Sequence, residues 1–131
     1  MEFFFSDSTS ANVGTQIGGG RPRSPGSTFI SGQYSEGTIT LVLGYLSIGE
    51  HLLGNNGDYV KIVPFYGGMA FAGNRFDYPS QTWIVQGSGK IEILEATNYV
   101  KGTFECIAPA DSIFGIIAPI TITEGEFNIK Y

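Results

Sequence analysis

Two segments near the C-terminus decide the fold, Gly102-Thr103-Phe104-Glu105-Cys106 and Gly125-Glu126-Phe127-Asn128-Ile129-Lys130-Tyr131. In both segments apolar and polar residues alternate, and each begins with the pattern Gly-x-Phe. Side chains of a β-strand point alternately to its two faces, so a period of two is typical of a half-buried strand. The two segments therefore predict a C-terminal β-hairpin, with the glycines as breaks between strands and the phenylalanines in the core.

Further short runs of this kind occupy most of the chain and are separated by Gly-rich turns. They cover residues 28–34, 38–43, 59–65, 69–72, 82–85, 90–95, 99–107, 120–123 and 126–131, while residues 48–53 fit either a strand or one helical turn. The linkers are too short for crossover helices, which favours antiparallel pairing. We therefore predict an all-β fold, a single antiparallel β-sandwich or closed β-barrel of about eight strands.

The N-terminal residues 1–26 differ in composition from the β domain predicted for residues 27–131. Residues 2–6 predict a short strand or extended arm, and residues 7–26 are rich in Gly, Ser and Pro, which is typical of a surface loop or of a segment ordered by a partner. Phe3, Phe4 and Phe5 are adjacent, so they cannot all face one side of a strand. We expect a partner contact through this strand, including a possible homo-oligomer.

Charge and hydropathy exclude several classes of partner. The 131-residue chain has a formal net charge of −5, which disfavours nucleic acid and anionic membrane surfaces, because both require basic patches. The longest apolar run, Ile113–Ile120, is too short to span a bilayer, so we predict no membrane span. Residues 1–5 lack the basic region of a signal peptide, and we expect a leaderless protein or a trimmed chain.

Residues that could carry catalysis or bind metal are scarce. His51 is the only histidine and Cys106 the only cysteine, which excludes an intramolecular disulfide and disfavours a zinc site. We expect Cys106 to be a buried structural residue and His51 to be exposed or half-buried. The acidic residues Glu92 and Glu105 could form the carboxylate pair of a glycan hydrolase, although solvated strand residues are the simpler interpretation. Residues 55–58 could bind calcium, but they more simply form an Asn-Gly turn.

Aromatic residues in or beside the central loops are the remaining functional signal. Tyr66, Phe76, Tyr78 and Trp83 could stack on sugar rings, with Asn74, Asp77 and Gln81 as hydrogen-bonding neighbours. Packing of the core and pinning of loops is the simpler role for such residues. We predict this set as the candidate ligand site, and we predict no catalytic residues, no metal and no cofactor.

Four segments carry a resemblance to a known family. They are Gly37–Leu41, Gly87–Leu94, Val100–Cys106 and Ile120–Tyr131. Together they resemble an uncharacterised family of β-rich domains in secreted proteins and lipoproteins of Bacteroidetes-type bacteria, over residues 27–131. The resemblance implies an extracellular, cell-surface or periplasmic location and supplies no catalytic residues.

These observations lead to three functional hypotheses. The first is a non-catalytic exported domain that acts in binding or assembly at the cell surface. The alternatives are a carbohydrate- or small-ligand-binding module and, third, a glycan hydrolase with a carboxylate pair. The partners expected are thus a glycan or another protein.

Overall fold

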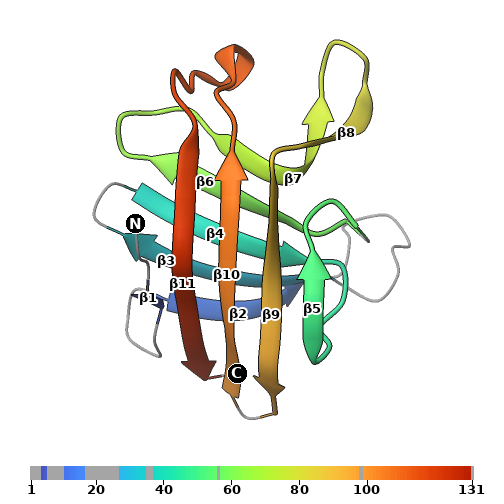
Figure 1. The fold of residues 1–131 in the computed structure, drawn as a ribbon, viewed down its shortest axis with the longest axis vertical. Coiled ribbons are helices and arrows are strands. Elements are labelled where there is room, and N and C mark those ends of the chain that lie inside the picture. The colour runs from blue at the N-terminus through green and yellow to red at the C-terminus, as the bar shows by residue number, and fades with distance from the viewer. Residues whose placement is uncertain are drawn as a thin grey trace.

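Two β-sheets packed face to face form the protein in the computed structural model, which describes residues 4–5, 11–16, 27–34, 37–55, 57–97 and 99–130. The first sheet has the order β1 (Phe4–Phe5), β11 (Ile120–Lys130), β10 (Tyr99–Ala108), β9 (Ser88–Ala96), β5 (Gly49–Leu52). The second has the order β2 (Ala11–Gln16), β3 (Ser27–Tyr34), β4 (Gly37–Leu43), β6 (Tyr59–Pro64), β7 (Ala70–Asp77), β8 (Thr82–Gln86). Strands of one sheet cross those of the other at a large angle (Figure 1).

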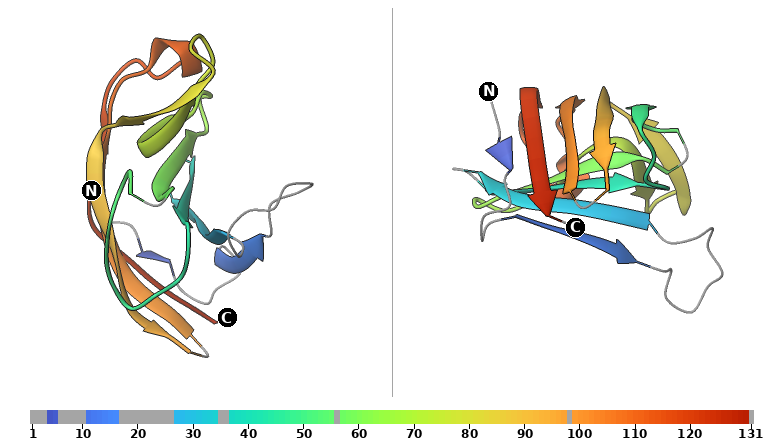
Figure 2. Two further views of the ribbon diagram at one scale, coloured as in Figure 1. Left: turned by 90° about the vertical axis from the view of Figure 1, so that its right-hand side faces the viewer. Right: turned by 90° about the horizontal axis from the view of Figure 1, so that it is seen from below.

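The prediction of an all-β fold is confirmed, and the architecture is the sandwich rather than the closed barrel. The described residues contain eleven strands instead of about eight, together with one 3-10 helix, η1 (Ser112–Phe114), and no helix among them is long and apolar enough to cross a membrane. The two layers, one of which curves around the other, are seen edge-on in Figure 2.

The core lies between the sheets and follows from the alternation of each strand. In β4, Ile39 and Leu41 are fully buried and alternate with half-buried threonines; in β9, Ile91 and Ile93 are fully buried from the opposite side. Complete burial of such a side chain stabilises the fold by about 1.5–3 kcal/mol. Facing rows of branched aliphatic residues therefore hold the two layers together.

The C-terminal pair of strands is confirmed, but its glycines do not separate strands as predicted. Gly102 lies inside β10 opposite Phe127, and Gly125 lies inside β11 opposite Phe104. Both glycines and both phenylalanines are buried. Each glycine leaves the space that the ring across the strand pair occupies. The predicted strands 120–123 and 126–131 accordingly form one continuous strand, β11, as far as Lys130; Tyr131 lies outside the described residues.

The N-terminal prediction needs correction in two respects. Ala11–Gln16, predicted as part of a loop, forms β2 and pairs antiparallel with β3. Its polar sequence shows little alternation, so the neighbouring strand determines its structure. Phe4 and Phe5 form β1, which pairs with β11 of the same chain in parallel, an exception to the predicted antiparallel pairing. Parallel pairing is possible here because the two strands come from opposite ends of the chain. Phe3 lies outside the described residues.

One central segment differs from expectation, and a second adopts one of its two predicted structures. β7 continues to Asp77, through most of the predicted loop 74–80, because it pairs with β8 from Gly73 to Asp77. Residues 48–53, left open as strand or helical turn, contain β5, which pairs with β9.

Candidate binding surface at one end of the sandwich

Three connecting segments lie in the upper part of the view in Figure 1. They are the β6–β7 turn (residues 65–69), the β7–β8 turn (residues 78–81) and the segment 109–119, which contains η1. The first and the third are joined by a hydrogen bond of 3.0 Å from the Met69 amide to the Phe114 carbonyl. We call these three segments together with Trp83 the apical surface.

The apical surface exposes large hydrophobic side chains from all three segments. Each of the following is more than half exposed: Phe65, Tyr66, Tyr78, Trp83, Ile113 and Ile117. Single exposed hydrophobic residues are ordinary, but a group of them at one end of a domain typically marks an interaction site.

Aromatic rings link two of these segments. The ring centroid of Phe76 lies 5.1 Å from that of Tyr78 and 5.6 Å from that of Trp83, in edge-to-face arrangements. Tyr78 in turn lies 6.0 Å from Phe114 of η1. These separations are those of favourable edge-to-face aromatic pairs, so the row holds the β7–β8 hairpin against η1.

A buried arginine of β7, Arg75, connects the segments of the apical surface through its side-chain contacts. The Nε of Arg75 lies 2.9 Å from Asp111 Oδ2 and donates to Gln86 Oε1, and Nη1 donates to the Phe76 carbonyl at 2.9 Å. The guanidinium also lies over the ring of Phe114, 5.2 Å from its centroid. A buried charge is stable only when it is paired and hydrogen-bonded, as it is here.

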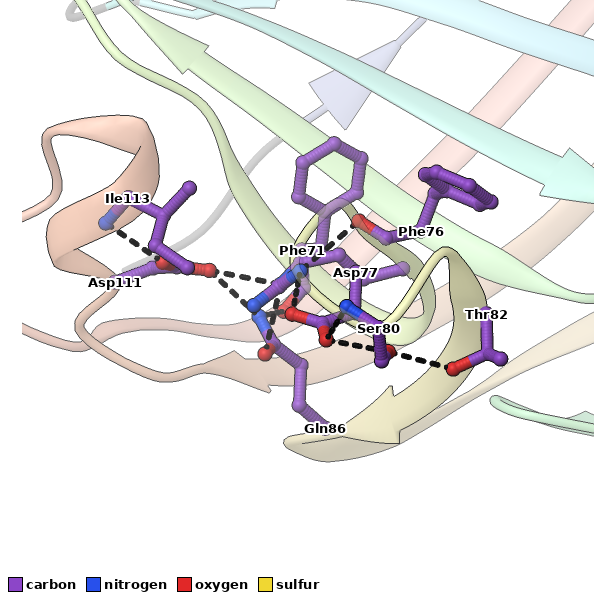
Figure 3. Close-up of polar contacts among 9 residues, drawn as sticks. Phe71, Phe76, Asp77, Ser80, Thr82, Gln86, Asp111 and Ile113 are labelled. Atoms are coloured by element: carbon purple, nitrogen blue, oxygen red, sulfur yellow. Dashed lines mark hydrogen bonds and ion pairs between the residues drawn. The ribbon is translucent and has the colours of Figure 1, made fainter.

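The β7–β8 turn is closed by a chain of polar contacts. Ser80 donates to Asp77 Oδ2 from both its amide and its hydroxyl, and its hydroxyl oxygen lies 2.7 Å from that of Thr82 (Figure 3). The hydrogen bonds from Ser80 and the nearby Arg75 lower the pKa of Asp77. Gln81 completes the turn in a left-handed conformation, with φ of 56°.

The apical surface carries no charge outside this cluster. Residues 62–89 contain only Arg75 and Asp77 as charged residues, and residues 106–123 contain only Asp111. Both carboxylates lie within 3.5 Å of the Arg75 guanidinium. The exposed part of this end is therefore mostly apolar and carries little charge, with Asp77 as its one partly exposed carboxylate.

The predicted ligand residues are only partly brought together. Phe76, Tyr78 and Trp83 form one cluster, and Tyr66 lies on the neighbouring β6–β7 turn. Asn74 instead donates to the Asp58 carbonyl, and Asp77 is engaged within its own turn. Sequence reasoning did not identify Arg75, Asp111 or Phe114. The sequence signal that could have indicated this cluster was Asp111, the one charged residue of the stretch 106–123.

His51 is buried, contrary to the prediction of an exposed or half-buried residue. Its Nδ1 lies 3.6 Å from Asp58 Oδ2, and its Nε2 lies 2.8 Å from the Ser47 carbonyl and 3.4 Å from the Ser47 hydroxyl. A carbonyl oxygen only accepts, so Nε2 carries a proton and cannot act as the base that activates Ser47. The arrangement resembles a catalytic triad in composition but not in hydrogen bonding.

The His51–Asp58 contact instead connects the two sheets. His51 belongs to β5 of the first sheet, and Asp58 immediately precedes β6 of the second. Asp58 also accepts a hydrogen bond of 2.8 Å from the Gly44 amide, where the chain leaves β4. Burial raises the pKa of Asp58, partly offset by this hydrogen bond and by His51. Asp58 therefore belongs to a buried structural contact. Its amide also donates to the Asn55 carbonyl at 2.8 Å, while Asn56 of the predicted Asn-Gly turn lies outside the described residues.

The other chemically notable residues lie away from the apical surface. Cys106 is buried as predicted, and burial raises its pKa to about 12. Glu92 and Glu105 lie on the neighbouring strands β9 and β10, and Glu105 is directly opposite Lys90. Lys90 lies 3.3 Å from Glu50, whose hydrogen bond raises the Lys90 pKa. Among the described residues, no group of three or more potential ligands could hold a metal ion.

Comparisons with protein families, with curated proteins and with solved structures found no match. The resemblance to the Bacteroidetes-type family of exported domains therefore stays a prediction.

Proposed function

We propose that this protein is a non-catalytic binding domain of the cell surface or extracellular space that contacts its ligand through the apical surface. The proposal rests on one observation: this end of the sandwich exposes large hydrophobic side chains and carries little charge. Large hydrophobic side chains of three segments face solvent, while the nearby charges are few and interact with one another: the buried Arg75 pairs with the buried Asp111 and lies 3.5 Å from the partly exposed Asp77. Exposing such a surface is unfavourable in water, so its covering by a ligand would be favourable.

The chemistry of the remaining residues supports binding rather than catalysis. Nε2 of His51 is held by a carbonyl, the Cys106 thiol is buried with a raised pKa, and the guanidinium of Arg75 is engaged by Asp111 and Gln86. A catalytic nucleophile is activated by an adjacent general base or by a lowered pKa. Cys106 has a raised pKa, His51 does not present Nε2 as a base, and a protonated guanidinium such as that of Arg75 is not a nucleophile.

A carbohydrate is the second candidate ligand, favoured by the hydrogen bonds beside Trp83. The Ser80 hydroxyl has one proton and donates it to Asp77, so the contact with Thr82 requires Thr82 to be the donor. The acceptor lone pairs of Thr82 are then available to a ligand hydroxyl. An exposed indole next to a hydroxyl acceptor suits a sugar ring, which presents an apolar face and polar edges.

The proposal is tested by binding of purified protein to cell-envelope fractions and to a glycan array. The test variant is Tyr78→Ala/Trp83→Ala, and the matched control is Leu94→Ala, a residue of β9 that is equally exposed but lies on the first sheet. We expect the double variant to lose binding and the control to keep it. Equal binding by all three proteins would refute a role for the apical surface, and envelope binding without any glycan signal would exclude the carbohydrate alternative.

A further inference from the structure

Strand β8 forms the edge of the second sheet next to the apical surface, and another strand could pair with this edge. β8 is the last strand in the sheet order and, among the described residues, pairs only with β7. Its sequence, Thr82-Trp83-Ile84-Val85-Gln86, contains no charge, proline or glycine, and its register with β7 runs from Gly73 to Asp77 without a shift. Trp83 and Val85 are each more than half exposed.

Edge strands of natural proteins ordinarily carry features that prevent pairing with another chain. These are charged side chains, prolines, bulges and short length. The opposite situation at β5, an edge of the first sheet, illustrates such protection: it has four residues and carries Glu50, which lies 3.3 Å from Lys90. β8 is also short, with five residues, but it carries no charge, no proline and no bulge, so its free edge is a template for an added strand.

The β8 sequence is complementary to itself in the antiparallel direction. We propose that β8 pairs with β8 of a second copy of this chain, around a two-fold axis at Ile84. This register pairs all five residues: Ile84 faces the partner's Ile84, Trp83 faces the partner's Val85 and Thr82 faces the partner's Gln86. Pairs of an aromatic with a β-branched residue are favourable across antiparallel strands, and the symmetry forms this pair twice.

Charge does not oppose this contact. Each copy has a net charge of −5, but β8 itself carries no charge, and the two charged residues of the strand it pairs with, Arg75 and Asp77, lie 3.5 Å from each other. The contact joins two six-stranded sheets into one continuous sheet and places two apical surfaces side by side. A pairing of five residues is a small interface, so the dimer is expected to be weak and dependent on concentration. Two adjacent surfaces would bind a repetitive ligand with increased avidity.

The register is tested by disulfide capture with the variant Ile84→Cys. Residues directly opposite in an antiparallel pair have Cα atoms about 4.5–5.5 Å apart, which is within the range of a disulfide. Cys106 does not compete, because it is buried. We expect a covalent dimer under mild oxidation, formed at least about tenfold faster than by Leu94→Cys, an exposed position of β9 away from the free edge. Equal rates for the two variants would overturn the proposal.

Sedimentation equilibrium provides an independent measurement on the unmodified chain. The wild type is expected to shift from monomer to dimer as its concentration rises, and Val85→Lys is expected to weaken the association at least about tenfold by placing a charge on the edge. Leu94→Lys is the matched control and should associate like the wild type. A wild type that stays monomeric at every concentration would also overturn the proposal. If Val85→Lys fails to fold, as judged by circular dichroism, the disulfide capture decides alone.

Discussion

The ring of Phe104 lies over the backbone of Gly125, directly across the β10–β11 pair. A Cβ atom added at position 125 would come closer than 3.0 Å to three carbons of that ring. Phe127 likewise lies opposite Gly102, where an added Cβ would meet its ring and, closer still, the Glu92 carbonyl oxygen of the neighbouring strand β9. The two Gly-x-Phe patterns are thus one packing unit, in which each strand supplies the ring and the space for the other.

This packing predicts that adding one methyl group at position 125 destabilises the protein. Gly125→Ala forces the Phe104 ring out of its position, and overpacking of this kind lowers the free energy of unfolding by about 1–3 kcal/mol. Urea unfolding followed by circular dichroism measures the change. Thr121→Ala, an exposed change in the same strand, should cost less than about 1 kcal/mol. Similar losses in the two variants would contradict the packing role of Gly125.

The Arg75–Asp111 pair predicts coupling between the β7–β8 hairpin and the η1 segment. Arg75→Met leaves the buried Asp111 carboxylate without its cation, and removing one partner of a buried pair costs about 3–5 kcal/mol. The double variant Arg75→Met/Asp111→Asn should lose less than the sum of the single changes, because neither charge remains. A double-mutant cycle of unfolding free energies measures this difference, and strict additivity would show that the two residues act separately.

The raised pKa of Asp58 predicts that the stability of the protein depends on pH. Burial raises its pKa in the folded state above the ordinary value of 3.8. As pH rises from 3.8 through the folded pKa, the native state holds more protons than the unfolded state, so the contribution of Asp58 to the free energy of unfolding falls. Asp58→Asn removes this titration and keeps an acceptor for the Gly44 amide.

The measurement is a series of urea unfolding curves between about pH 4 and about pH 7. The decline of stability attributable to Asp58 should be absent from Asp58→Asn and present in Glu126→Gln, a change at an exposed carboxylate. The same pH profile for all three proteins would mean that Asp58 titrates normally in the folded state.

The burial of Cys106 predicts that its thiol is unreactive in the native protein. With a pKa of about 12 its thiolate fraction near neutral pH is about three orders of magnitude below that of an ordinary cysteine, and burial further limits access. Titration with a thiol-specific chromogenic reagent should give slow labelling in buffer and rapid labelling in denaturant. Rapid labelling in both conditions would show that the β10 side chain is accessible.

The alternating strands could be predicted from sequence because their signal is local. The apolar positions of β4, β9 and β10 repeat every second residue, and the same residues are buried in the structure. β2 could not be found in this way, because its residues Ala11–Gln16 lack alternation and become a strand by pairing with β3. The parallel contact of β1 with β11 depends likewise on the opposite end of the chain.

The residues of the candidate site likewise fall into two groups, those predictable from nearby sequence and those brought together only by the fold. Phe76, Tyr78 and Trp83 were identifiable because they are close in sequence, so a short hairpin brings them together. Arg75 and Asp111 are 36 positions apart, and only the packing of η1 against β7 makes them partners. The sequence by itself determined the class of fold and the chemical character of its strands, since periodicity and turn residues act over short distances. The tertiary structure decided which glycine faces which ring, which charges neutralise one another and which strand edge stays open, because these depend on contacts between residues far apart in the chain.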